Sequence, residues 1–244
     1  MSTENTLRSP AERKIGLTNN QLKLIAMVSM LLDHVGLVLF PDLLIFRVLG
    51  RVSFPIFAYM IAEGCFYTKN RAKYLLQLLI LGLGCQVVFQ IATGMLYQGI
   101  LITFSLSVIM IFAIDFFLRR KCFWRGAVMT LTLLGGIFAC VIAPILFKEQ
   151  GYDVDYGYVG VLIPIVVYYM PGKLWKLIAL GALLAVMASS SEAYQWVSLA
   201  SLPLLYFYNG RRGRASLKYL FYVFYPVHLV VVYGIGMLVA YLSK

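Results

Sequence analysis

The sequence predicts an all-α protein, a polytopic transmembrane helical bundle of about nine helices. Three observations lead to this fold class: 61% of the residues are hydrophobic, only 13% are charged, and the apolar residues form long continuous runs. A soluble domain carries about a quarter charged residues, whereas a helix needs about 20 apolar residues to span a bilayer. The strands of a membrane barrel would read as short alternating segments, so these runs favour helices.

Nine apolar segments follow one another along the chain, and each is a candidate helix. They cover residues 20–40, 52–67, 74–92, 98–118, 126–147, 156–170, 173–190, 192–208 and 217–242. Thr18 with Gln21 fits a capping box at the start of the first segment. Ser53 followed by Pro55 fits the start of the second segment.

Prolines and glycines separate the segments or bend them. Turns are predicted at Pro41, Pro171-Gly172 and Asn209-Gly210, and kinks at Pro144, Pro164, Pro203 and Pro226. Residues 42–51 mix two arginines with Leu, Ile, Phe and Val. This composition predicts a short helix that lies in the membrane interface or re-enters the membrane.

The basic residues predict the orientation of the bundle. With the N-terminus in the cytoplasm, 17 of the 21 Lys and Arg residues fall on the cytoplasmic side. The exceptions are Arg47, Arg51, Lys148 and Lys244. The positive-inside rule therefore favours a multi-pass protein of the cytoplasmic membrane. We expect a polar cytoplasmic tail at 1–18, a single transmembrane domain at 19–244, and an external C-terminus.

The same charge distribution excludes some classes of partner. The net charge of +11 is accounted for by basic loops, and no Gly-rich phosphate loop or nucleic-acid motif accompanies it, so no nucleic-acid partner is expected. The four cysteines show no metal-ligand spacing, so no metal site is expected.

The two histidines of the chain both lie inside apolar segments. Asp33 and His34 interrupt the first segment, and His228 lies within the last. An ionisable residue at membrane depth is costly and by default marks a functional site. At 1.5 Å per residue, His34 lies about 16 Å along its helix from Lys23, and His228 about 15 Å from Lys218. The two histidines therefore lie at similar depth and can face one cavity.

Asp33 needs a partner other than its neighbour His34, because consecutive helical residues point about 100° apart. Arg51, at the outer end of the second segment, is the nearest basic candidate by topology. Two readings stay open. Either these residues form a functional site, or Asp33–Arg51 is a structural pair, His34 a packing residue and His228 a hydrogen-bonding contact between helices.

Two further positions, Glu63 and Asp155, have two readings each. Glu63 either lines the cavity or pairs with Arg71 or Lys73. Asp155 and Tyr156 are predicted on the outer side, at the start of a helix. Either residue can contact a ligand there, and Asp155 can instead cap the helix.

Several stretches resemble the TraX family. They are residues 23–34 (KLIAMVSMLLDH), 50–58 (GRVSFPIFA), 63–64, 70–71, 73–75, 155–157 (DYG), 208–213 (YNGRRG) and 218–229 (KYLFYVFYPVHL). Members of that family are linked to N-terminal acetylation of conjugative pilin. The family also looks like a distant relative of membrane acyltransferase family 3, which takes acyl groups from cytoplasmic acyl-CoA. In those enzymes a basic residue precedes the first-helix histidine by the spacing that Lys23 and His34 have here.

The resemblance implies an acyltransferase that uses acetyl-CoA as co-substrate, with no bound cofactor and a protein or glycan acceptor such as a pilin-like protein. Histidine suits the role of base because its reference pKa is near neutral. The expected catalytic residues are His34, Asp33, His228 and Arg51. The expected substrate and CoA contacts are Lys23, Glu63, Arg71, Arg211, Arg212, Asp155 and Tyr156. Two alternatives remain, a proton-coupled transporter and a non-catalytic pilus or fimbria assembly factor.

Overall fold

The computed structural model describes residues 16–213 and 217–242, so most of the predicted tail at 1–18 lies outside the described residues. The regular elements are α1 (Asn19–Val38), α2 (Leu44–Gly50), α3 (Ser53–Tyr67), α4 (Arg71–Thr93), α5 (Ile100–Arg119), α6 (Phe123–Ile137), the π-helical η1 (Phe138–Ile142), α7 (Ala143–Leu146), the 3₁₀ helix η2 (Lys148–Gln150), α8 (Gly157–Tyr169), α9 (Gly172–Ser189), the 3₁₀ helix η3 (Ala193–Ala200), α10 (Ser201–Tyr206) and α11 (Lys218–Leu242). The predicted all-α helical bundle is confirmed.

Seven helical stretches in the described part of the chain are long and apolar enough to cross a membrane. They are α1, α2 with α3, α4, α5, α6 through α7, α9 and α11. The remaining two of the nine predicted segments are shorter: α8 has 13 residues, and the segment 192–208 is divided between η3 and α10.

The predicted segment 192–208 is not one regular helix. It has eight residues of 3₁₀ helix followed by six residues of α-helix. A 3₁₀ helix rises about 2.0 Å per residue and an α-helix about 1.5 Å, so the two together still cover about 25 Å. They return the chain to the end of the bundle where α9 begins, and there the Lys173 ammonium donates a hydrogen bond of 2.7 Å to the Tyr208 carbonyl.

The short helix predicted within residues 42–51 is α2, and it forms the first part of a span. α2 runs antiparallel to the second half of α1: the Ser29 hydroxyl donates to the Leu49 carbonyl, and a Cβ on Gly36 would overlap Phe46. α3 then begins at Ser53, as predicted, and completes the span Leu44–Tyr67. α2 is therefore packed on the helix that carries Asp33, and together with α3 it makes one candidate span.

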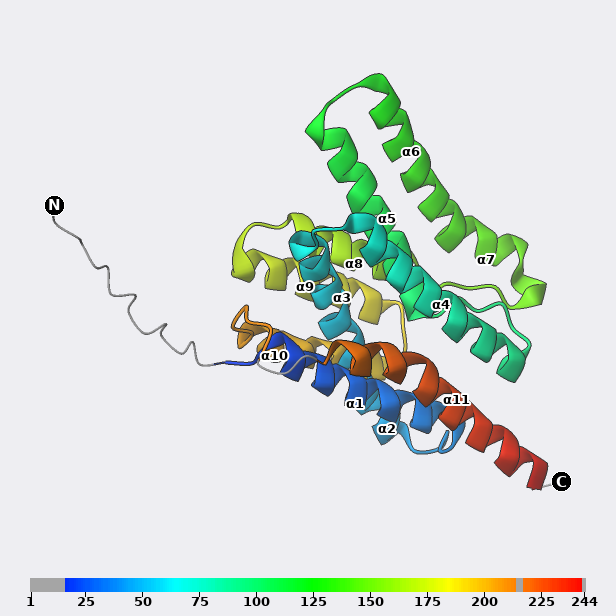
Figure 1. Ribbon diagram of the computed structural model, residues 1–244. Coiled ribbons are helices and arrows are strands. Elements are labelled where there is room, and N and C mark those ends of the chain that lie inside the picture. Colours follow the sequence, from blue (N-terminus) through cyan, green and yellow to red (C-terminus); the bar gives the residue numbers. More distant parts are fainter. Residues whose placement is uncertain (1–15, 214–216, 243–244) are drawn as a thin grey trace.

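The bundle has two ends with different residues. At one end, which we call the Lys23 end, the backbone before α1 meets the backbone after α10, with the Leu17 amide 2.8 Å from the Phe207 carbonyl. At the other, the Asp155 end, α1 ends and α8 begins. Figure 1 shows α11 lying along α1, and the hairpin of α5 and α6 projecting from the rest of the bundle. Which end faces the cytoplasm stays a prediction.

Candidate active site

His34 on α1 and His228 on α11 meet inside the bundle. Their ring centroids are 5.0 Å apart, with the rings edge to face at 73°. The His228 ring is also stacked on Phe224, with centroids 4.6 Å apart, and only 5% of His228 is exposed. The equal depth calculated from the sequence thus corresponds to direct contact between the first and last helices.

Each histidine is held in one tautomer by its own helix. The Nδ1 atom lies 2.9 Å from the Met30 carbonyl in His34 and 2.7 Å from the Phe224 carbonyl in His228. A carbonyl oxygen only accepts, so Nδ1 carries the proton and Nε2 of the neutral ring holds the lone pair. Nε2 of His228 is buried and has no partner in the described structure. In both rings Nε2 is therefore the nitrogen that can accept a proton.

The histidines line a cavity of about 90 Å³. Its other lining residues come mainly from α4, from the start of α5 and from the loop before α8. They are Met30, Gly82, Cys85, Gln86, Phe89, Tyr97, Gly99, Ile100, Leu101, Asp155, Tyr225 and Leu229. We call this space the histidine cavity. It is small, and its wall is mostly apolar with a few polar side chains.

Two further cavities lie between the histidine cavity and the Lys23 end. A middle cavity of about 120 Å³ shares Leu101 and Tyr225 with the histidine cavity. A larger cavity of about 570 Å³ opens at the Lys23 end. It shares Lys23, Tyr74, Phe221 and Tyr222 with the middle cavity. The three cavities therefore follow one another along α1 and α11 from Lys23 to His34, each sharing wall residues with the next.

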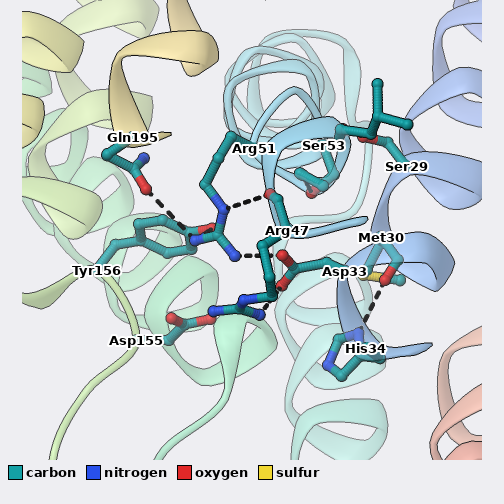
Figure 2. Close-up of polar contacts among 12 residues, drawn as sticks. Ser29, Met30, Asp33, His34, Arg47, Arg51, Ser53, Asp155, Tyr156 and Gln195 are labelled. Atoms are coloured by element: carbon teal, nitrogen blue, oxygen red, sulfur yellow. Dashed lines mark hydrogen bonds and ion pairs between the residues drawn. The ribbon is translucent and has the colours of Figure 1, made fainter. Parts of the chain in front are cut away.

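Asp33 lies outside the histidine cavity and pairs with two arginines (Figure 2). Its Oδ1 accepts from Arg51, as the topology predicted, and its Oδ2 accepts from Arg47 at 2.8 Å. Arg51 is 7% exposed and also donates to the Gln195 side chain at 3.3 Å. A Cβ on Gly50 would overlap the Asp33 carboxylate, so the glycine allows this close approach of α2 to α1.

Asp155 does not cap α8, because Tyr156 occupies the N-cap position and has a positive φ of 59°. The Asp155 carboxylate instead accepts from the Tyr97 hydroxyl at 2.8 Å and lines the histidine cavity. Burial raises the pKa of Asp155 to about 6, against the opposing effects of the Tyr97 hydrogen bond and the Arg51 charge. The Tyr156 ring is stacked on Phe54 with centroids 3.9 Å apart, so Tyr156 packs in the core.

At the Lys23 end, the ion pairs differ from those predicted. Glu63 lines the large cavity but pairs with Lys176 on α9 at 3.4 Å, and not with Arg71 or Lys73. Arg71 pairs with Asp115 on α5 and does not line the cavity. The prediction that Arg71 contacts CoA therefore gains no support from the geometry.

Of the other basic residues predicted to contact CoA, two line the large cavity and one does not. Lys23 and Arg212 both line the large cavity, and the Lys23 ammonium lies 5.2 Å from the centre of the Phe221 ring. Arg211 is exposed and is not among the described lining residues. The geometry therefore keeps Lys23 and Arg212 as the basic pair of this cavity.

Three polar residues near the histidines or Asp33 were not predicted. Gln86 and Tyr97 line the histidine cavity, and Gln195 accepts from Arg51. A signal for Gln86 is present in the sequence, because a glutamine inside an apolar run must find a hydrogen-bond partner within the membrane.

The fold and the site define a multi-pass helical membrane protein with a histidine pair and a buried ion-pair group in its interior. The family model described as "TraX protein" matches residues 18–236, and the chain belongs to the TraX family. No solved structure matches the chain.

Two relatives illustrate the family. The "Probable fimbrial assembly protein FimC, serogroup H1" of Dichelobacter nodosus is 28% identical over 240 residues, which cover 90% of this chain and 96% of that protein. The "Uncharacterized protein RP591" of Rickettsia prowazekii (strain Madrid E) is 36% identical over 88 residues, covering 35% of this chain and 32% of that protein.

Proposed function

We propose that this chain is an integral membrane acyltransferase that moves an acetyl group from acetyl-CoA to an amine or hydroxyl of a protein or envelope component. The observation that carries the proposal is the series of three adjoining cavities whose last member is lined by two contacting histidines with basic Nε2 atoms. Acyl transfer needs a base beside the thioester of the acyl donor, and the position of the histidines in the last of these cavities supports the proposal.

His34 is the proposed base. The acceptor N–H or O–H loses its proton to Nε2 of His34 while its nitrogen or oxygen attacks the thioester carbonyl. A bond forms between the carbonyl carbon and the acceptor, and the carbon–sulfur bond then breaks. The departing CoA thiolate takes up the proton, so the products are the acylated acceptor and free CoA thiol. His228 lies beside His34 and stabilises the ring that carries the transferred proton.

The large cavity at the Lys23 end is the proposed site for the nucleotide part of CoA. Its volume of about 570 Å³ is within the roughly 300–1,000 Å³ of small-molecule sites. Lys23 and Arg212 place positive charge at its wall, which suits phosphate groups. The narrow middle cavity then accommodates the uncharged pantetheine arm and brings the thioester towards the histidines.

The acceptor is proposed to enter from the Asp155 end or from the membrane plane. The name of the Dichelobacter nodosus relative favours a protein of a fimbria or pilus as the acceptor. The same name also favours a second candidate function, a non-catalytic role in fimbrial assembly. The two candidates differ in one measurable property, the release of CoA from acetyl-CoA.

The test uses the purified full chain in lipid nanodiscs, acetyl-CoA labelled in the acetyl group, and a membrane extract as the source of acceptor. Transfer of label with release of CoA thiol supports the proposal. His34→Ala should reduce turnover by about 10²- to 10⁴-fold, as expected for loss of a general base. Leu37→Ala, at an exposed position of the same helix, is the matched control and should keep turnover.

Three outcomes would count against the proposal. A well-folded His34→Ala protein with near-normal turnover would remove His34 as the base. Absence of CoA release, together with defective fimbriae in cells that lack the gene, would favour the assembly factor. Proton-linked uptake of a solute into liposomes would favour a transporter.

A further inference from the structure

Four buried side-chain atoms have no hydrogen-bond partner in the described part of the chain. They are Gln86 Nε2, Gln195 Nε2, Ser198 Oγ and His228 Nε2. Buried polar atoms are nearly always hydrogen-bonded, so each exception needs an explanation, and a missing ligand is one. Two of the four, Gln86 and His228, line the histidine cavity.

Gln86 differs from its neighbours on α4. Gln77, two and a half turns earlier, accepts a hydrogen bond of 3.0 Å from Tyr222. Gln90, one turn later, is exposed. Gln86 instead lines the histidine cavity, and its Nε2 donor is buried without a hydrogen-bond partner in the described structure, which is costly for an amide in an apolar helix. The simplest use of this donor is to hold an acceptor atom of a molecule that enters the cavity.

The groups in the histidine cavity are complementary to one reacting centre. Gln86 supplies an N–H donor, and the two histidines supply Nε2 lone pairs. A thioester carbonyl offers an oxygen that becomes negatively charged during attack, and the attacking group offers a proton. The cavity volume of about 90 Å³ is well above the roughly 10–15 Å³ that admits one water, so an acyl carbonyl has room beside both histidines.

We propose that Gln86 is a catalytic residue that donates a hydrogen bond from Nε2 to the thioester oxygen of the acyl donor. This inference rests on the proposed acyl transfer. When the acceptor attacks, the carbonyl π electrons move onto this oxygen, and His34 holds the acceptor's proton. The oxyanion then re-forms the carbonyl, the carbon–sulfur bond breaks, and the proton passes to the CoA thiolate. Gln86 stabilises the charge at the intermediate stage and neither gains nor loses a proton.

The decisive variant is Gln86→Met, which keeps the length of the side chain and removes the donor. Loss of one oxyanion donor typically lowers kcat by about 10²- to 10³-fold, so we expect a fall of that size with KM for acetyl-CoA changed little. Thermal stability should stay equal or rise, because an unpartnered polar group is replaced by an apolar group of similar shape. Gln90→Met is the matched control on the same helix and should keep both properties.

The measurements are steady-state kinetics with acetyl-CoA varied and thermal unfolding of the same preparations. A second variant, Gln86→Glu, keeps the shape but replaces the donor by an acceptor, and it should also lose kcat. Gln86→Met turnover within about twofold of wild type would overturn the inference while leaving the acyltransferase intact. A parallel loss of stability and turnover would also overturn it, since it would show that Gln86 anchors structure or a water. A wild-type protein that transfers no acetyl group would overturn the proposed function, and this inference with it.

Discussion

Replacing Asp33 by asparagine should destabilise the protein more than replacing either of its arginine partners. Asp33→Asn leaves Arg47 and Arg51 facing each other without the carboxylate between them. Removing one partner of a buried ion pair costs about 3–5 kcal/mol. For a chain of this length, about 2–4 °C of unfolding temperature corresponds to 1 kcal/mol, so the expected loss is about 6–20 °C.

The arginine variants should follow in a fixed order. Arg51→Met removes the pair with Asp33 and the hydrogen bonds to Gln195 and to the Arg47 carbonyl, but it leaves Asp33 paired with Arg47. Arg47→Met removes one hydrogen bond to a charged group, worth about 1.5–3 kcal/mol, from a more exposed side chain. Replacing all three residues by Leu and Met should recover much of the loss, because no charge is then left buried.

The assay is thermal unfolding of the purified variants in one detergent, followed by kinetics with acetyl-CoA. Arg51→Met and Asp33→Asn should lower kcat and leave KM for acetyl-CoA nearly unchanged, because the ion-pair group lies outside the cavities and positions the helix that carries His34. If Arg47→Met costs as much stability as Asp33→Asn, or if the kinetic effect is confined to KM, the reasoning about this group is wrong.

Three further predictions concern the two ends of the bundle. Lys23→Ala or Arg212→Ala should raise KM for acetyl-CoA about tenfold and leave kcat unchanged, because a phosphate contact stabilises the ground state and the transition state equally. Lys73→Ala, at an exposed position, serves as the control. The pKa of Asp155 is raised by burial to about 6, so the folded protein binds this proton more tightly than the unfolded chain. The free energy of unfolding should therefore fall as pH rises from about 4 through about 6. The unfolding temperature of Asp155→Asn should show a smaller fall over this pH range. If the unfolding temperatures of the wild type and the variant change with pH in the same way, the raised pKa of Asp155 is contradicted. A reporter fused after Lys244 should read as external, and a cytoplasmic reading would mean that the predicted count of nine helices is wrong by one.

Features set by local helix geometry could be predicted from the sequence. The capping box of Thr18 and Gln21 forms as its spacing indicates, since both partners lie within one turn. The contact between His34 and His228 agrees with the equal depth calculated from a constant rise per residue, and the pairing of Asp33 with Arg51 follows from the order of the helices. These predictions needed only distances along a helix and a topology.

Features set by rotation about the helix axis could not be predicted. Most residues of α4 are apolar, so nothing in its sequence showed which face carries Gln86 towards the histidines. The partner of Glu63 is Lys176, and only the packing of α3 near α9 brings the two together. The change to 3₁₀ helix in 193–200 was missed for a related reason, because apolar composition does not distinguish one helical pitch from another.

Helix α1 separates two groups of polar residues that have different tasks. The 100° between consecutive residues turns Asp33 towards α2, where it holds Arg47 and Arg51, and turns His34 towards α11 and the histidine cavity. The ion pairs therefore fix the rotation and depth of α1, and this position sets where Nε2 of His34 lies. The two neighbouring residues should therefore respond differently to substitution. We expect Asp33→Asn to lose stability first and turnover as a consequence, and His34→Gln to lose turnover while the helix stays in place.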